Sequence, residues 1–201
     1  MYKLLMISGD RGLAQGKRGA FFNTLEEFHK YWERIDIICP YVEGAISGPL
    51  FGNVFLHPSP WPLWLQPLWI ARKGEELYRA QRFDLMTTHE YPPFYNGIGV
   101  RMLASRIKTP YVMEIMHIPG HPKAGSLKEM LYRQLMCWYI SRDVASARAI
   151  RVINRTETPD FLIEAGVPRD KLVYAHAMYI DLETFRPMPE VAKTFDVVYA
   201  A

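Results

Sequence analysis

Cysteine and strong charge are both scarce in this 201-residue chain, and each absence limits what the protein can be. The two cysteines, Cys39 and Cys137, provide neither a disulfide framework nor the spacing of a zinc site, and we expect both thiols to be buried and reduced. The formal net charge is only +3 and no basic block occurs, which argues against a nucleic-acid-binding protein. A weak attraction to phosphates or to anionic lipid is still compatible with that charge.

Long hydrophobic runs are missing as well. The longest, around residues 60–71, is too short and too rich in proline to span a bilayer. The first ten residues, MYKLLMISGD, predict a β-strand and a loop rather than a signal peptide. We therefore expect a cytoplasmic protein. Three tryptophans and two basic residues fit either core packing or peripheral contact with the inner face of the membrane: Trp61, Trp64, Trp69, Arg72 and Lys73.

What the sequence does contain is a regular alternation of apolar runs and amphipathic stretches. Strands are predicted at residues 2–7, 35–39, 54–56, 83–88, 111–116, 149–153 and 172–175, and helices from about residues 20, 67, 95, 126 and 158. This order predicts an α/β fold with a Rossmann-like parallel sheet and helices on both faces. Ligands bind such sheets beyond the carboxyl ends of the strands, so the residues that directly follow the strands are the candidate site.

Two of the predicted helices carry detailed signals. Phe21, Leu25, Phe28 and Trp32 recur at helical spacing on one face of the first helix. At the start of the fourth predicted helix, Ser126 and Glu129, three residues later, have the sequence of a capping box. That helix is amphipathic, with an apolar face formed by Leu127, Leu131, Leu135 and Trp138.

The loop after the first strand, G-D-R-G-L-A-Q-G-K-R-G at residues 9–19, is rich in glycine and in basic side chains. Its glycines would let a ligand approach the backbone closely, and a helix that begins just beyond them would favour an anion. The glycine spacing matches neither the dinucleotide-binding fingerprint nor the P-loop. A flexible surface loop is therefore the alternative interpretation.

His89 and Glu90 stand at the end of the strand predicted at residues 83–88. A histidine and a carboxylate in that place can hydrogen-bond sugar hydroxyls or hold a proton. In the alternative interpretation, His89 caps the next element and Glu90 is solvated.

His117 directly follows the strand predicted at residues 111–116 and precedes a loop that contains glycine. It is the second histidine that we expect at the crevice, although a lone histidine is more often a bystander. Glu114 lies within the same strand, where a carboxylate requires a polar interior or a cation as its partner.

The segment 149–187 has a strand, a short helix, a G-V-P-x-x-K sequence, a second strand and a closing D-x-x-x-F-x-P. These motifs are carried by Gly166, Val167, Pro168, Lys171, Asp181, Phe185 and Pro187. In this order they resemble the N-terminal domain of family 4 glycosyltransferases. The strand ends Phe83-Asp84 to Glu90 and Pro110 to His117, and FDVVYAA at residues 195–201, add to the resemblance, which spans nearly the whole chain.

Three features depart from the family pattern. Asn154 stands where the family often has serine, and Met178-Tyr179 stands where it often has Asn-Gly. Tyr179 does not freely replace a glycine of positive φ, so the turn there must differ. The first loop also lacks the usual adjacent glycine pair.

The resemblance implies the N-terminal, acceptor-side half of a GT-B enzyme. Such an enzyme moves a sugar, with retention, from a nucleotide-diphosphate sugar to a sugar, polysaccharide or lipid-linked acceptor. The donor is a co-substrate, and no further cofactor and no metal is expected. The implied roles are contact with the donor phosphates by Gly16, Lys17, Arg18 and Gly19, catalysis by His117, and acceptor binding by His89 and Glu90.

The same resemblance predicts the domain organisation. Residues 1–187 form the acceptor-side domain, 188–194 a linker, and 195–201 the first strand of a truncated donor-binding domain, so this fragment is expected to be inactive by itself. Two other functions stay open: a sugar-nucleotide epimerase of the same architecture, and a non-catalytic module that binds a glycan or a partner.

Overall fold

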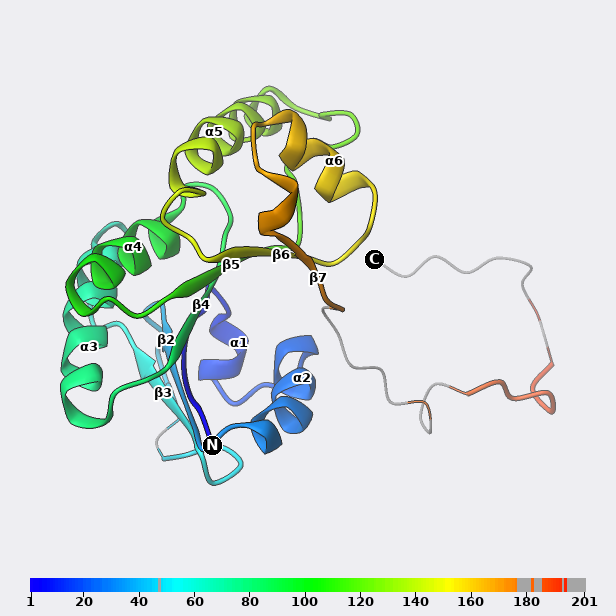
Figure 1. Ribbon diagram of the computed structural model, residues 1–201. Coiled ribbons are helices and arrows are strands. Elements are labelled where there is room, and N and C mark those ends of the chain that lie inside the picture. The colour runs from blue at the N-terminus through cyan, green and yellow to red at the C-terminus, as the bar shows by residue number, and fades with distance from the viewer. Residues whose placement is uncertain (47, 177–181, 183–185, 193, 195–201) are drawn as a thin grey trace.

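A seven-stranded parallel sheet organises the chain in the computed structural model, which describes all residues except 47, 177–181, 183–185, 193 and 195–201 (Figure 1). The strand order is β3-β2-β1-β4-β5-β6-β7, which confirms the Rossmann-like prediction. The strands are β1 (Lys3–Ile7), β2 (Arg34–Cys39), β3 (Val54–Pro58), β4 (Leu85–His89), β5 (Tyr111–Ile115), β6 (Ala149–Val152) and β7 (Leu172–Tyr174).

Helices cover both faces of this sheet (Figure 1). α1 (Arg11–Ala14) and α2 (Ala20–Phe28) lie on one face, and the other face carries α3 (Gln66–Gln81), α4 (Tyr95–Ile107), α5 (Leu127–Asp143) and α6 (Glu157–Glu164). Short 3-10 turns occupy His29–Tyr31, Leu63–Leu65 and Arg169–Lys171. The helix α1 inside the first loop was not predicted; the side chain of Asp10 caps it by accepting the Leu13 N–H at 3.1 Å.

Among the described residues, two large hydrophobic cores lie on opposite sides of the sheet, and a small third cluster contains Ala14, Cys39 and Val42. On β1, Leu5 and Ile7 belong to the larger core beneath α3 to α6, and Leu4 and Met6 belong to the core beneath α1 and α2. This alternation is the two-residue period of a strand, and both sides are buried because both are covered.

The α2 side of the sheet is covered unevenly. On β4, Met86 points to the larger core and is fully buried, whereas its neighbours Leu85 and Thr87 point to the α2 side and are only half-buried. Val112 on β5 is half-buried in the same way. An open groove therefore runs along α2 over β4 and β5.

The capping prediction for α5 is confirmed, but the face that this helix buries differs from the predicted apolar face. Ser126 Oγ accepts the Glu129 N–H at 3.2 Å, and the Glu129 carboxylate accepts the Gly125 N–H at 2.7 Å in place of the N-cap amide. The helix packs inward through Met136, Tyr139 and Ile140. Leu127, Leu131 and Trp138 are exposed and Leu135 is half-buried, because Tyr139 stacks on Phe94 at 4.1 Å and sets the rotation of the helix.

The tryptophan cluster is divided between core and surface. Trp61 and Trp69 meet edge to face at 5.6 Å, and Trp69 packs against the larger core. Trp64 is 66% exposed. Within the described part of the chain, no helix is long and apolar enough to cross a membrane.

The prediction for the cysteines is confirmed in part, and the described residues do not test the predicted domain boundaries. Cys39 is buried and Cys137 half-buried, and both are free thiols; burial raises the pKa of Cys39 to about 12. Asp181, Phe185 and the strand predicted at 195–201 lie outside the described residues, as do Met178 and Tyr179. Residues 188–191 of the predicted linker form a turn in which the Val191 N–H donates to the Met188 carbonyl.

Candidate functional site

The groove along α2 leads to the carboxyl ends of β4, β5 and β6, where the fold predicts a ligand site. Its volume is about 720 Å³. Phe21, Phe28 and Trp32 form much of its apolar wall, while polar side chains gather at the end of the strands. An apolar cleft with a few converging polar groups is the usual form of a small-molecule site.

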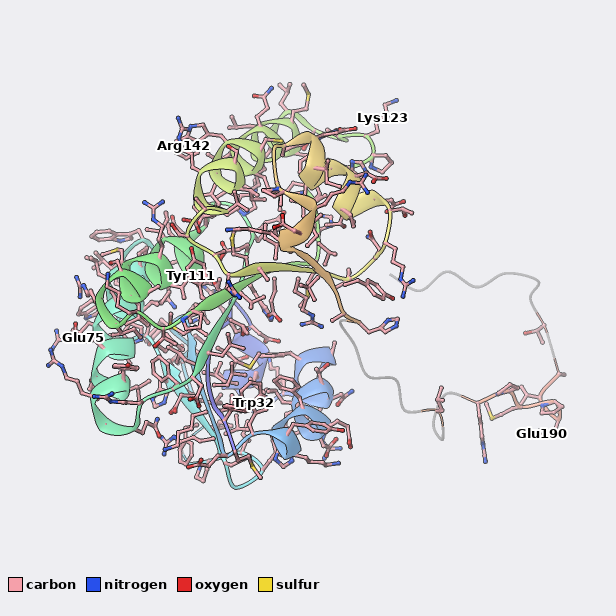
Figure 2. The ribbon with its side chains drawn as sticks, in the orientation of Figure 1. Trp32, Glu75, Tyr111, Lys123, Arg142 and Glu190 are labelled. Atoms are coloured by element: carbon pink, nitrogen blue, oxygen red, sulfur yellow. The ribbon has the colours of Figure 1, made fainter. Side chains whose placement is uncertain are left out.

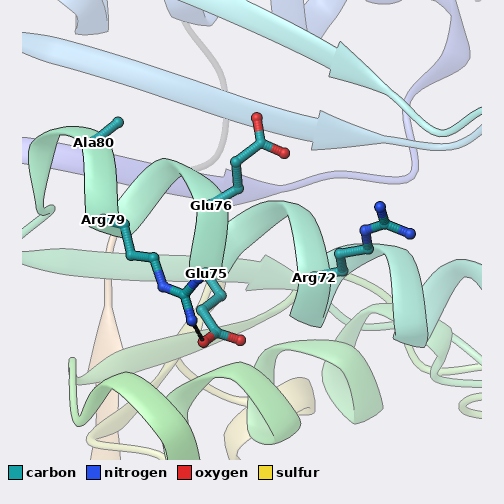
Figure 3. A pocket seen from close by; sticks show the side chains of 5 residues that line it. All are labelled: Arg72, Glu75, Glu76, Arg79 and Ala80. Atoms are coloured by element: carbon teal, nitrogen blue, oxygen red, sulfur yellow. Dashed lines mark hydrogen bonds and ion pairs between the residues drawn. The ribbon is translucent and has the colours of Figure 1, made fainter.

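A second depression, of about 530 Å³, lies on the surface of α3 and has none of these features (Figure 3). Arg72, Glu76 and Arg79 are exposed around it, and Arg79 forms an ion pair with Glu75 at 2.5 Å. Its charges neutralise one another along one helix, and no strand end reaches it, so we do not assign it a function.

Three charged or titratable side chains from adjacent strands meet at the polar end of the groove. His89 of β4, Glu114 of β5 and Arg151 of β6 are direct neighbours in the strand register. His89 Nε2 lies 2.6 Å from Glu114 Oε2, and Arg151 Nη1 lies 2.6 Å from Glu114 Oε1. We call these three residues the ionic cluster. The other amino group of Arg151 donates to the His176 carbonyl.

Glu114 is the centre of the ionic cluster and is ionised. Burial raises the pKa of its carboxyl, but the hydrogen bond and charge of His89 together with the charge of Arg151 outweigh burial and hold the pKa below its ordinary value. Because the carboxylate engages Nε2 of His89, Nδ1 is the ring nitrogen that can bond a substrate hydroxyl. His89 and Arg151 both remain partly exposed to the groove.

The sequence indicated part of this cluster. His89 was a candidate acceptor contact, and the expectation that Glu114 needs a polar or cationic partner is confirmed. Arg151 was missed, although a charged residue within a four-residue buried strand is the same kind of signal as Glu114. Asp10 and His176 also line the groove. Asp10 belongs to loop 9–19 and His176 directly follows the strand predicted at residues 172–175, but neither was named as a site residue.

Glu90 is placed differently from His89, because successive side chains of a strand alternate. Its side chain lies beneath α4 and is only 4% exposed, and it does not line the groove. Glu90 Oε1 accepts the Thr88 hydroxyl at 2.8 Å. This placement does not support contact between Glu90 and an acceptor: a ligand in the groove meets His89 instead.

Burial and the nearby Asp143 carboxylate, opposed in part by the Thr88 hydrogen bond, raise the pKa of Glu90 to about 8. Asp143 is itself buried and accepts the hydroxyls of Tyr111 and Tyr139 at 3.1 and 3.3 Å. Glu90 therefore belongs to a polar cluster inside the larger core, and its carboxyl group is protonated in the folded protein at neutral pH.

A Glu90→Gln variant is expected to be less sensitive to alkaline pH than the parent protein. The raised pKa means that the stabilising contribution of Glu90 is complete below its ordinary pKa of 4.5 and is lost as the pH rises through about 8. Glutamine retains the neutral shape and does not titrate. Urea unfolding measures the free energy of unfolding at about pH 5 and pH 9. Between these values the parent protein should lose a few kcal/mol more than the variant, at most about 5 kcal/mol. Equal pH slopes in the two proteins would contradict this assignment.

The residues predicted to contact donor phosphates lie beside the groove, and none of them lines it. Gly16 has φ +72°, a conformation that favours glycine, and Gly19 is the N-cap of α2. Lys17 and Arg18 are exposed, and Arg18 approaches Glu26 only to 4.0 Å. Ala20 and Phe21, the next residues along, do line the groove. The role of this loop stays a prediction.

His117 is exposed at the carboxyl end of β5 and lies outside the ionic cluster. Its ring stacks on Tyr91 at 6.0 Å, and Tyr91 meets Tyr132 edge to face at 6.4 Å. The structure therefore divides the predicted histidines: His89 faces the groove and His117 belongs to an exposed aromatic group nearby. In the described part of the chain, no three His, Cys, Asp or Glu side chains are grouped to hold a metal ion.

Solved structures with a similar fold bind nucleotides and sugars. Anabaena HepE in complex with UDP-glucose matches with a TM-score of 0.59 and 12% identity, over 94% of this chain and 47% of HepE. S. aureus MnaA with UDP matches with a TM-score of 0.55 and 14% identity, over 96% and 49% of the two chains. Neisseria meningitidis UDP-GlcNAc 2-epimerase bound to UDP-GlcNAc matches with a TM-score of 0.53 and 12% identity, over 86% of this chain and 45% of the epimerase.

The chain has the fold of one half of these proteins. It spans about half of their length, and these similarities of 12–14% identity show the architecture alone. No protein-family model and no curated protein matches the sequence. The resemblance to family 4 glycosyltransferases thus rests on the motifs in the sequence alone.

Proposed function

We propose that the whole protein is a glycosyltransferase that moves a sugar from a nucleotide-diphosphate sugar to an acceptor, and that this chain supplies the acceptor-side half of its cleft. The main support is the ionic cluster: a guanidinium and a carboxylate-oriented imidazole stand where Rossmann-like folds bind ligands. A second support is the fold of the chain, which is shared with proteins solved with UDP and UDP-sugars. The motifs in segment 149–187 favour transfer over other nucleotide-sugar reactions.

In this proposal the residues act by positioning and by charge. Glu114 holds the imidazole of His89, whose Nδ1 bonds a sugar hydroxyl in the groove, and Arg151 attracts an anionic group of the donor or acceptor. Backbone amides near Gly16 and Gly19 stabilise the charge of the departing phosphate. His117 stays the proposed group next to the reacting sugar, a role that comes from the resemblance. Retention, the absence of a further cofactor and the division into domains at residues 187 and 194 come from it as well.

A sugar-nucleotide epimerase is the second candidate. It is favoured by one specific observation, the shared fold with a UDP-GlcNAc 2-epimerase that was solved with UDP-GlcNAc. Both reactions require a nucleotide-sugar site, so the geometry of this half of the cleft supports either. A non-catalytic glycan- or partner-binding module is the third candidate, and it predicts binding without turnover.

The experiment that separates them is product analysis with the whole protein. Incubation with UDP-glucose or UDP-GlcNAc and a mixture of sugar and lipid-linked acceptors should release UDP and join the sugar to one acceptor, with the anomeric configuration retained. An altered nucleotide sugar formed without an acceptor would establish the epimerase. Saturable binding of the sugar with unchanged substrate would establish the binding module. Heat-inactivated protein serves as the blank.

A further inference from the structure

The outer face of α5 is apolar and uncovered. Leu127 is 82% exposed, Leu131 62%, Trp138 55% and Met130 49%. They occur at helical spacing on the side opposite Met136 and Ile140, which enter the larger core. We call these four exposed residues the α5 face. Soluble proteins rarely expose so many large apolar side chains together unless the surface binds something.

The segment that carries this face has mainly positive charge. Residues 117–142 contain four basic side chains and one acidic side chain, Glu129, a net charge of +3 that equals that of the whole chain. The Glu129 carboxylate is engaged by the Gly125 amide at 2.7 Å. Figure 2 shows Lys123 and Arg142 extending outward near the two ends of α5. The surface is therefore attractive to anions.

Cations and aromatic rings are paired along the same helix. The guanidinium of Arg142 lies 4.6 Å from the ring of Trp138, and Lys128 Nζ lies 5.5 Å from the ring of Tyr132. An amphipathic helix with apolar and aromatic side chains on one side and basic groups beside them is the pattern that binds at the boundary between lipid headgroups and acyl chains.

We propose that the α5 face docks on the surface of a bilayer that contains anionic lipid. The apolar side chains enter the boundary region, and Lys123, Lys128 and Arg142 contact lipid phosphates. A second copy of the chain is a poorer occupant, because two-fold pairing would bring the two +3 segments together. The proposal does not depend on the reaction assigned above. It places the membrane contact on α5, whereas the sequence pointed to the tryptophans at residues 61–69, which precede and begin α3.

The test is co-sedimentation of the protein with vesicles of phosphatidylcholine alone and with added phosphatidylglycerol. We expect strong binding only with phosphatidylglycerol, weakened by salt. A Leu131→Ser/Trp138→Ser variant should bind at least about tenfold more weakly, and each of Lys128→Gln and Arg142→Gln about fivefold. All four side chains are exposed enough for the variants to fold, which thermal unfolding checks.

Matched controls replace exposed residues away from the α5 face: Trp64→Ser for the tryptophan and Arg169→Gln for the arginine. Both should bind like the parent. Three results would overturn the proposal: no binding to anionic vesicles, binding that the α5 variants leave unchanged, or binding that only Trp64→Ser abolishes. A concentration-dependent dimer that Leu131→Ser/Trp138→Ser dissociates would identify a second copy as the occupant instead.

Discussion

A Glu114→Gln variant of the whole protein is expected to lose about a hundredfold or more in kcat while its KM for the donor changes little. Glutamine has the shape of glutamate, but it removes the negative charge that faces both His89 and Arg151 at 2.6 Å. The imidazole then loses the partner that fixes its orientation. Steady-state kinetics at varied donor concentration measures the effect, because it separates kcat from KM.

The role of Glu114 as a residue that positions His89 can be tested with a double variant. His89→Ala should lose at least as much activity, and the loss in the double variant should be smaller than the product of the two single losses, since Glu114 acts in part through His89. Additive losses, or a Glu114→Gln variant with normal activity and a normal unfolding temperature, would disprove the role of the ionic cluster. If His117→Ala abolishes turnover while His89→Ala does not, the reaction centre lies at His117.

A Gly97→Ala variant is expected to destabilise the fold by about 2 kcal/mol, although alanine favours a helix by about 1 kcal/mol over glycine. A Cβ at this position in α4 would lie 2.1 Å from the Tyr139 hydroxyl and 2.5 and 2.6 Å from the Glu90 carboxylate oxygens. Tyr139 cannot turn aside freely, because its ring stacks on Phe94 at 4.1 Å. Urea unfolding measures the change.

The matched control removes the hydroxyl that the new methyl group meets. In a Tyr139→Phe background the shortest contact disappears, so Gly97→Ala should cost less there than in the parent protein. If Gly97→Ala stabilises the parent by the helix propensity alone, the close packing of α4 against α5 is not as the structure has it.

The local elements could be predicted because each has its own signal in the chain. The apolar run of β1, the proline near the start of α3 and the serine before α5 act within a few residues of themselves, and all three elements are present. Alternation of strands and helices then leads to a parallel sheet, since a crossover connection is needed between parallel neighbours.

The candidate site could be predicted only in part. The sequence placed His89 and Glu90 together, and strand alternation separates them: one faces the groove and the other lies at 4% exposure beneath α4. Which of the two faces the groove depends on which side of β4 a helix covers, and that is a property of the packed sheet. The same holds for α5, which has apolar residues on two sides. The stacking of Tyr139 on Phe94 turns the side with Met136 and Ile140 into the core and leaves the other side exposed.

By itself, the sequence determined the Rossmann-like class, the strand ends that bear polar groups and the weak positive charge. Only the tertiary structure decided that His89, Glu114 and Arg151 meet, although they are 25 and 37 residues apart along the chain. The physical reason is that strand order and register bring such residues within 2.6 Å of one another. Strand order and register are set when both faces of the sheet are buried at the same time, and a short stretch of sequence does not specify this.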